Sequence, residues 1–235
     1  MSNETYAFTN NNGNKVVVNP ALNNKANSIA QLLLNKAKKA EPQVTKDLLE
    51  ITKGTSATIS YDQEDDNGVV RNSLTYRLKT KDSLSDKLKG DANYIINKIG
   101  NEPIYDALRY TALVNNPDML VKSYNSITLN LEKRGYNVYR CKNTLNKYSL
   151  ENPYRGINTI IKTPKGYKFE LQFHTKDSLW IKEENHKLYK TLSNNMSEKE
   201  RIKILDKMFK NSQKLKDIPG AGTIREIKPL KKEAN

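Results

Sequence analysis

The sequence predicts an α+β domain in which helices flank a small mixed β-sheet. Apolar and polar residues alternate along residues 167–175, which is the pattern of a strand with one buried face. Several longer segments instead repeat apolar residues at helical spacing and carry signals for helix ends. A chain of 235 residues is long enough for one domain with a sizeable core and short appendages.

Six segments have the spacing of apolar residues that is typical of helices. In the first, Asn19 can cap the helix and Pro20 suits its first position. In the second, Thr45 is the candidate cap and Gly54 the end. The six predicted helices cover residues 19–40, 45–54, 84–99, 116–135, 178–192 and 197–215.

The later helices carry end signals of their own. We expect Gly90 to interrupt the third helix. Gly135 lies just past the fourth helix, where a left-handed residue commonly ends a helix. Ser197 and Glu200 form a capping-box pattern at the start of the sixth.

Shorter apolar runs between these helices predict the strands of the sheet. Residues 57–81 are expected to form two strands around the turn pair Asn67-Gly68. Residues 158–175 are expected to form a hairpin that turns at Pro164-Lys165-Gly166. Two further single strands are predicted over residues 104–114 and 136–144.

The ends of the chain differ in composition from its centre. The N-terminal segment is polar and rich in asparagine, and we expect it to be flexible. The segment after Pro219 is basic, and we expect it to be loose. The sequence therefore predicts a flexible segment over residues 1–19, a domain over 20–218 and a basic tail over 219–235.

The charge of the chain favours partners that are polyanions. Lys and Arg number 40 against 26 Asp and Glu, so the net charge is +14. Such an excess attracts nucleotides, nucleic acid or an anionic membrane surface, although a solvated surface rich in lysine and asparagine would have the same composition. Cys141 is the only cysteine, which excludes an intramolecular disulfide and a zinc site built from cysteines.

We expect neither a membrane span nor a signal peptide. The sequence holds no apolar run of membrane-spanning length. The first 14 residues lack the basic and apolar regions of a signal peptide. These features and the single cysteine fit a reducing compartment, but a toxin exported by a dedicated secretion machine would look the same.

The polar face of the strand over residues 167–175 points to chemistry. Its apolar face is an ordinary core face. The opposite face places a carboxylate, an amide and an imidazole two residues apart, at Glu170, Gln172 and His174.

A basic block precedes the third helix. As a strand, it would place Arg77, Lys79 and Lys81 on one face, with Ser83 and Lys87 at the start of that helix. Cations that point toward a helix N-terminus suit a polyphosphate. The alternative is a solvent-facing edge strand that lysines protect from aggregation.

Other candidate residues are less specific by themselves. Asp106 opens a predicted strand, where an aspartate is usually a turn residue. His186 is typical of a surface helix, with Glu183 within reach on the same helix face.

Three segments, taken in this order, resemble the synthetase domain of the RelA/SpoT homologues: "YRLKTKDSLSDKL", "DALRYTALV" and "YRGINTIIKTPKGYKFELQFHTKDSLWIKEENHKLY". Enzymes of this family transfer the β,γ-pyrophosphate of ATP to the 3′-hydroxyl of a purine nucleotide. The resemblance covers about residues 70–192, and more loosely the helices over 20–53. It is nearest to small, stand-alone or effector-type members and implies a nucleotidyltransferase-like α+β fold.

The resemblance implies a role for each group of residues. Asp106 and Glu170 would hold Mg²⁺, and Glu170 would also activate the 3′-hydroxyl. The residues expected to bind ATP are Arg77, Lys79, Lys81, Ser83 and Lys87. Those expected to bind the acceptor are Tyr154, whose ring would stack on the base, Lys142 and Asn158. Those expected to support the site are Gln172, His174, Glu183 and His186.

Three departures from the family pattern bear on the substrates. In place of D-x-x-G-x-R, the chain has an arginine shifted by two positions, Arg109, and Thr111 where the arginine is usual. His174 replaces the arginine of E-x-Q-x-R-T, and Asn158 replaces the histidine of the acceptor loop. The two metal carboxylates are intact, so these changes concern the acceptor and the binding of ATP.

The resemblance implies ATP and a purine nucleotide as substrates, with products of the (p)ppGpp or (p)ppApp type. Toxin-type relatives also include enzymes that act on the 3′ end of tRNA, and a catalytically inactive nucleic-acid-binding module is a further alternative. The implied partner of a toxin is an immunity or antitoxin protein, with no membrane involved. The implied location is the bacterial cytoplasm, or outside the cell after export by a dedicated secretion system.

Overall fold

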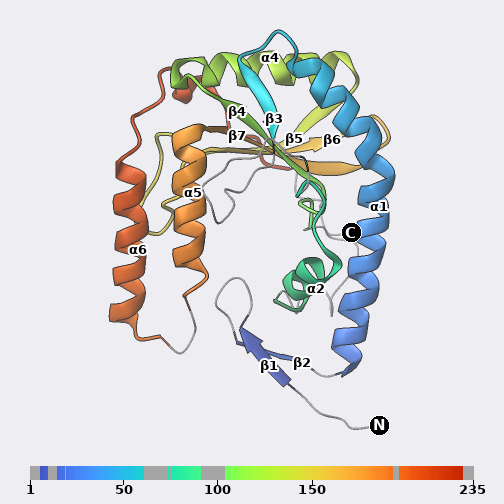
Figure 1. Cartoon of the computed structure of the whole chain (residues 1–235), viewed down its shortest axis with the longest axis vertical. Helices are drawn as coiled ribbons and strands as arrows, with labels where there is room; N and C mark the ends of the chain where they lie inside the picture. The colour runs from blue at the N-terminus through green and yellow to red at the C-terminus, as the bar shows by residue number, and fades with distance from the viewer. Residues whose placement is uncertain are drawn as a thin grey trace.

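The fold is a five-stranded mixed sheet with helices around it, as predicted (Figure 1). The computed structural model describes residues 6–9, 15–18, 20–60, 74, 76–90, 104–192 and 196–229. The strands, in their order across the sheet, are β3 (Ala57–Ser60), β4 (Arg109–Val114), β7 (Lys168–Thr175), β6 (Ile157–Lys162) and β5 (Asn137–Asn143). Strands β4 and β7 are parallel, and the other neighbours are antiparallel.

Helices cover one face of the sheet and both of its ends. Figure 1 shows α4 lying across the sheet, α1 running along one side with α2 beside it, and α5 and α6 side by side at the other end. Two 3₁₀ turns, η1 (Pro117–Met119) and η2 (Ala221–Thr223), complete the described elements. The helices are α1 (Pro20–Thr52), α2 (Lys81–Gly90), α4 (Leu120–Lys133), α5 (Lys176–Tyr189) and α6 (Glu198–Gln213). None of the helices in the described ranges is both long and apolar enough to cross a membrane.

The core lies between the sheet and the helices α1 and α4. The apolar face of β7 is fully buried, as its alternation predicts. On this face, the Phe169 ring meets the Tyr110 ring edge-on at 5.9 Å, and Phe173 meets Tyr124 at 5.0 Å. Edge-to-face contacts of this kind add to the free energy of burial and fix the position of each ring.

Several predicted helix signals are confirmed. Both members of the Ser197–Glu200 capping box bond as expected at the start of α6. Gly54 and Gly135 have φ values of +82° and +78°, the left-handed conformation that ends a helix. The hairpin turn over residues 164–166 also lies where the sequence placed it.

The two predicted N-terminal helices are in fact one. Helix α1 continues through Pro42, although proline usually breaks a helix because it lacks an N–H donor. The buried side chains of Ala37, Val44 and Leu48 keep one apolar stripe running past the proline, so packing holds the helix together. Thr45 does not cap a helix, since its hydroxyl bonds Glu41 and the Tyr110 hydroxyl instead.

Both chain ends have more structure than the sequence predicts. Within the segment expected to be flexible, β1 (Tyr6–Thr9) and β2 (Lys15–Val18) form an antiparallel pair. In the tail expected to be loose, Ala221 and Ile224 are buried in the core, and Ile227 pairs with Cys141 through two backbone hydrogen bonds. These apolar residues recur at every third position within a basic segment, but three such positions are too few to predict a helix or a strand.

The basic block is not a regular strand. It makes one isolated bridge, Leu78 to Leu108, and α2 begins directly after it at Lys81. Asp106 does not open a strand but lies in the turn before β4. The Asn67-Gly68 turn and the second half of the predicted helix over 84–99 lie outside the described residues.

Candidate active site

The polar face of β7 is continued by polar residues on its two neighbouring strands. Arg109 of β4 lies beside Glu170 in the sheet register, and Asn158 of β6 lies beside Gln172. Asn158 donates a 2.6 Å hydrogen bond from its amide nitrogen to the Glu170 carboxylate. Residues on one sheet face at such positions are neighbours, so the sheet gathers these groups opposite the aromatic core.

Asp106 holds two lysines at the end of this polar face. Its Oδ2 atom lies 3.0 Å from the Lys79 ammonium and 2.8 Å from that of Lys87. Burial alone would raise the pKa of Asp106, but the charges of Lys87 and Lys79 outweigh it and lower that pKa to about 2. Asp106 is therefore ionised at any pH at which the protein would work.

The backbone fixes this ion cluster beside Glu170. The Lys79 amide donates to the Ala107 carbonyl at 3.0 Å, and the Arg109 amide donates to the Arg77 carbonyl at 2.9 Å. On the other side, the Glu170 amide donates to the carbonyl of Leu108 at 3.0 Å. The turn that carries Asp106 thus joins the basic block to β7 and brings the two predicted carboxylates onto adjacent segments.

The predicted ATP-binding residues are only partly brought together. Lys79 and Lys87 converge on Asp106, whereas Arg77 turns toward α1 and bonds the Glu41 carboxylate. Lys81 is exposed at the start of α2. The backbone amide of Ser83 bonds the Thr80 hydroxyl, which caps that helix, at 3.1 Å.

No pattern in the sequence indicates that Glu41 lies near the site. Glu41 accepts a hydrogen bond from the Thr45 hydroxyl as well as from Arg77. Burial opposes its ionisation, but the bonds from Arg77 and Thr45 lower the pKa of Glu41 below its usual value. Helix α1 therefore supplies a charged partner that fixes the direction of the arginine, a long-range contact that no local pattern predicts.

Tyr154, which is half-buried, and His174, which is fully buried, form a hydrogen-bonded pair. The Tyr154 hydroxyl lies 3.0 Å from His174 Nε2, and His174 Nδ1 lies 2.9 Å from the Ser178 hydroxyl. Since that hydroxyl also lies 3.2 Å from the carbonyl of Thr175 and can donate to it, Nδ1 carries the proton and Tyr154 donates to Nε2. Burial, and secondarily the charge of Lys182, hold the pKa of His174 well below its usual value, so the ring is neutral.

This pair explains one departure from the family pattern. A neutral histidine fits a fully buried position between a phenol and a serine, where an arginine would need an anionic partner. Burial raises the pKa of Tyr154, and the negative charge of Glu170 raises it further. His174 is therefore placed to hold the Tyr154 hydroxyl through a hydrogen bond.

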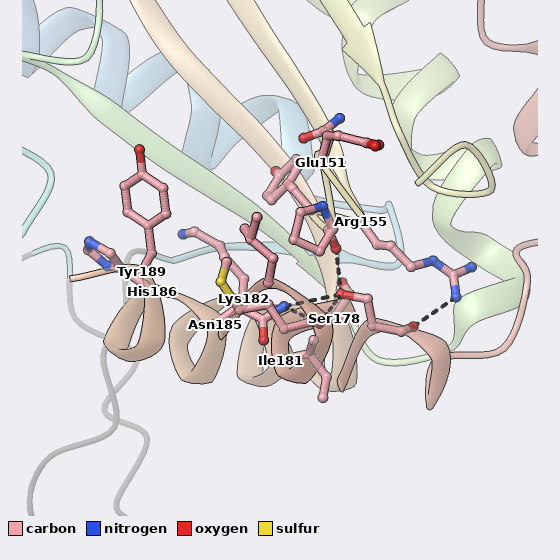
Figure 2. A pocket seen from close by; sticks show the side chains of 14 residues that line it. Glu151, Arg155, Ser178, Ile181, Lys182, Asn185, His186 and Tyr189 are labelled. Atoms are coloured by element: carbon pink, nitrogen blue, oxygen red, sulfur yellow. Dashed lines mark hydrogen bonds between the residues drawn. The ribbon is translucent and has the colours of Figure 1, made fainter. Parts of the chain in front are cut away.

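A pocket of about 480 Å³ opens beside Tyr154, between α5, α6 and residues 151–155 (Figure 2). Lys182 and His186 of α5 line it together with Tyr189. Asn185 is also part of its wall, and its amide bonds the carbonyl of Met208 at 3.0 Å, which fixes α6 against α5. The volume is within the range of small-molecule sites.

Two other predicted site residues, Glu183 and Lys142, have peripheral positions. Glu183 pairs with Lys182 at 3.2 Å and does not line the pocket. Lys142 is exposed on β5, paired in register with Asn158. Asn158 itself is an orienting partner of Glu170, which the sequence did not foresee.

The site offers oxygen ligands that suit Mg²⁺. Among the predicted site residues, three buried side-chain oxygens have no hydrogen-bond partner within the described ranges: Asp106 Oδ1, Asn158 Oδ1 and Gln172 Oε1. The described ranges contain no group of three His, Cys, Asp or Glu that could hold a metal. Mg²⁺ is commonly bound through one or two carboxylates, with substrate phosphates and water as its other ligands.

Gly156 is required for the Tyr154–His174 pair. A Cβ atom at this position would lie 2.5 Å from His174 Cε1 and 2.6 Å from the Tyr154 hydroxyl oxygen. Neither ring can withdraw, since each is held by the other and His174 is also held by Ser178.

We expect Gly156→Ala to destabilise the fold by about 1–3 kcal/mol, the range of overpacking substitutions. The measurement is the free energy of unfolding from urea denaturation. The matched control is Gly222→Ala, because a Cβ there meets no atom within 4 Å. Equal stability of the two variants would show that the buried pair is not tightly packed.

Comparisons with known proteins bear on the fold. No family model matches the chain, and no curated protein sequence matches it either. Among solved structures, small alarmone synthetase 2 from Bacillus subtilis is similar, with a TM-score of 0.50 and 15% identity over 80% of this chain and 91% of that one.

Two further solved structures are similar at lower scores. Small alarmone synthetase 1 from Bacillus subtilis, bound to its product pppGpp, gives a TM-score of 0.48 and 16% identity over 77% of this chain and 86% of that one. The type VI effector Tas1, in complex with its immunity protein, gives 0.43 and 14% over 78% and 96%. The α+β architecture and its match to the first of these structures confirm the predicted resemblance at the level of the fold: the chain has the fold of the small alarmone synthetases of the RelA/SpoT type.

Proposed function

We propose that the chain is an ATP-dependent nucleotide 3′-pyrophosphokinase that forms products of the (p)ppGpp or (p)ppApp type. The observation that carries this proposal is the ionised Asp106, which is paired with two lysines, has one oxygen without a partner and lies next to the segment of Glu170. A carboxylate among cations suits a metal-bound polyphosphate. The shared fold with an alarmone synthetase supports the same activity.

In the proposed reaction, the acceptor's 3′-oxygen attacks the β-phosphorus of ATP. A bond forms between these two atoms while the bond from the β-phosphorus to the oxygen of the α-phosphate breaks, so AMP leaves with the electron pair. Mg²⁺, held by Asp106 and Glu170, would neutralise phosphate charge. The attacking hydroxyl loses its proton to Glu170, whose carboxylate is oriented by the bond from Asn158.

The two lysines would have different roles. The Lys79 side chain is only 10% exposed and is fixed beside Asp106, whereas that of Lys87 is 40% exposed. Lys87 can therefore turn toward bound phosphates without leaving a buried charge unpaired. Positively charged groups held in place before the reaction stabilise charge that develops in the transition state.

The acceptor base would occupy the pocket beside Tyr154. Its volume of about 480 Å³ suits one nucleoside better than a folded RNA. The fixed Tyr154 ring offers a stacking surface, and Glu170 lies close by to receive the proton. We therefore favour a free purine nucleotide, with the 3′ end of tRNA and an inactive nucleic-acid-binding module as the alternatives.

The direct test is to incubate the protein with γ-labelled ATP, Mg²⁺ and either mixed purine nucleotides or bulk tRNA. We expect label on the 3′-position of a free nucleotide. Label on tRNA alone would show that the acceptor is tRNA rather than a free nucleotide. Binding of RNA without any transfer of label would favour an inactive nucleic-acid-binding module. Such an activity would make the chain a toxin in a cell that lacks a matching immunity or antitoxin protein.

Glu170→Gln and Asp106→Asn should each lower the transfer rate at least about a hundredfold, because each removes one charge from the proposed metal site. Both replacements keep the shape of the side chain, so circular dichroism should show an intact fold. The control is Glu50→Gln, an acidic residue of α1 whose partner is Arg134. Near-full activity of Glu170→Gln would refute the metal and base roles together.

Arg77→Ala should raise the KM for ATP, and Arg77→Lys should restore it only in part, since an ammonium cannot replace a planar guanidinium. If Glu41 acts by orienting Arg77, Glu41→Gln should raise the same KM with little change in kcat. Steady-state kinetics at saturating acceptor measure both effects. An unchanged KM in Arg77→Ala would leave this residue a purely structural role between the basic block and α1.

Tyr154→Phe should be mild and Tyr154→Ala severe toward the acceptor, since stacking on a base contributes about 1–3 kcal/mol. The KM for ATP should stay the same in both variants. A free nucleotide should also show a shallow dependence of affinity on salt, whereas RNA would release many counterions. Equal acceptor KM values for wild type and Tyr154→Ala would place the acceptor outside this pocket.

A further inference from the structure

A second pocket, of about 800 Å³, lies on the other side of the sheet from Glu170. Its walls come from three separate parts of the chain: one side of α1, the residues that follow α4, and the turn between β6 and β7. Tyr136 and Tyr167 line it, and both belong to the face of the sheet that carries Phe169. None of the residues assigned to pyrophosphate transfer lines this pocket.

We call this second pocket the α1 pocket, and hydrogen bonds between its lining residues hold its walls in place. Asp47 of α1 is buried and accepts hydrogen bonds from the Tyr136 hydroxyl at 2.6 Å, from Gln43 at 3.0 Å and from Arg134 at 2.9 Å. These bonds join α1 to the end of α4 and leave the carboxylate well satisfied. Burial would raise the pKa of Asp47, but these donors lower it, so the group is ionised.

The turn between β6 and β7 is fixed as firmly. The Thr163 amide donates to the Tyr167 carbonyl at 2.7 Å, and the Thr163 hydroxyl accepts from the Tyr167 amide at 3.0 Å. Pro164 packs against Gly135, where a Cβ atom would lie 3.4 Å from the proline ring. A ligand that binds to a preformed site loses little binding free energy to the ordering of loops and side chains.

The charges around the α1 pocket favour an anion. Lys36, Lys39 and Lys165 line it, are exposed and form no ion pair with any residue that the structure describes. Asp47 is the one acidic residue in the lining, and its charge is balanced by Arg134, so the three lysines give the lining its excess of positive charge. Lysines that surround a low-dielectric wall raise the local concentration of anions.

The floor of the α1 pocket is apolar. Ala40, Val44 and Pro164 lie beside the rings of Tyr136 and Tyr167. The Tyr136 ring is held edge-on to Phe169, with 6.4 Å between the ring centroids. An apolar floor with a few charged groups at the rim is the usual construction of a small-molecule site, and its volume lies within the range of such sites.

We propose that the α1 pocket binds a small organic anion in which an apolar body carries a phosphate, carboxylate or sulfonate head. The body would lie on Ala40, Val44 and the tyrosine rings, and the head would meet Lys36, Lys39 and Lys165. This proposal does not depend on the proposed transferase activity, because the pocket shares no residue with it. A nucleotide and a fatty acid both have this chemistry, and the experiment separates them.

The test uses the fluorescent probe 8-anilinonaphthalene-1-sulfonate, which combines an aromatic body with an anionic head, and the whole chain without ATP or Mg²⁺. We expect saturable binding that weakens at least about tenfold in Lys36→Glu/Lys39→Glu. The matched control is Lys38→Glu/Lys46→Glu, which makes the same change of charge at exposed positions of α1 outside the pocket. That control should bind the probe like the wild type.

A second variant tests the floor rather than the charge. Ala40→Phe places a ring in the pocket and should also weaken the probe at least about tenfold, while thermal unfolding confirms that the variant folds. Displacement of the probe by GMP would identify a nucleotide-like ligand, and displacement by laurate an acyl ligand; either supports the proposal. Equal probe affinity in the pocket variants and in the control pair, or no saturable binding, would overturn it.

Discussion

The ion cluster at Asp106 is the interaction on which the candidate active site depends. A carboxylate that is mostly removed from water needs partners, and Asp106 obtains them from Lys79 of the basic block and Lys87 of α2. The same contacts hold that block and that helix against the end of the sheet, where backbone hydrogen bonds join them to β4 and β7. The ion cluster and these backbone hydrogen bonds together bring the predicted phosphate-binding lysines to the carboxylate of Glu170. The charges of the cluster thus hold the basic block and α2 in place and also form part of the proposed phosphate-binding site.

A second constraint acts at the acceptor side of the site. The pair of Tyr154 and His174 is possible only because residue 156 has no side chain, and because the histidine stays neutral in a buried position. The histidine is neutral and both of its ring nitrogens have partners, so the change from the family pattern is compatible with a working site. The site thereby has a neutral aromatic ring, held against Tyr154, where the family pattern has a cation. Such a change bears on which base is bound rather than on the transfer step.

The sequence predicted what depends on local pattern and missed what depends on distant contacts. The alternation along β7 and the capping box of α6 act over a few residues, and the structure confirms both. The break expected near Thr45 is wrong because packing of Val44 and Leu48 carries α1 through Pro42. Arg77 was placed on a phosphate-facing row, but its partner Glu41 is 36 positions away and could not be foreseen. Both pockets are likewise lined by segments far apart in the chain.

The distribution of cations favours a nucleotide over an RNA as the proposed partner. A net charge of +14 could mean a continuous track for a nucleic-acid backbone. Instead, the described lysines with a clear geometric role belong to separate sites: two meet Asp106, and three surround the α1 pocket on the opposite face of the sheet. A single RNA strand would have to pass around the edge of the sheet to contact both sets of lysines. Separate concave sites, each with a few cations beside an apolar or aromatic surface, suit separate small anions better, because each can neutralise a compact charge while burying a flat or apolar body.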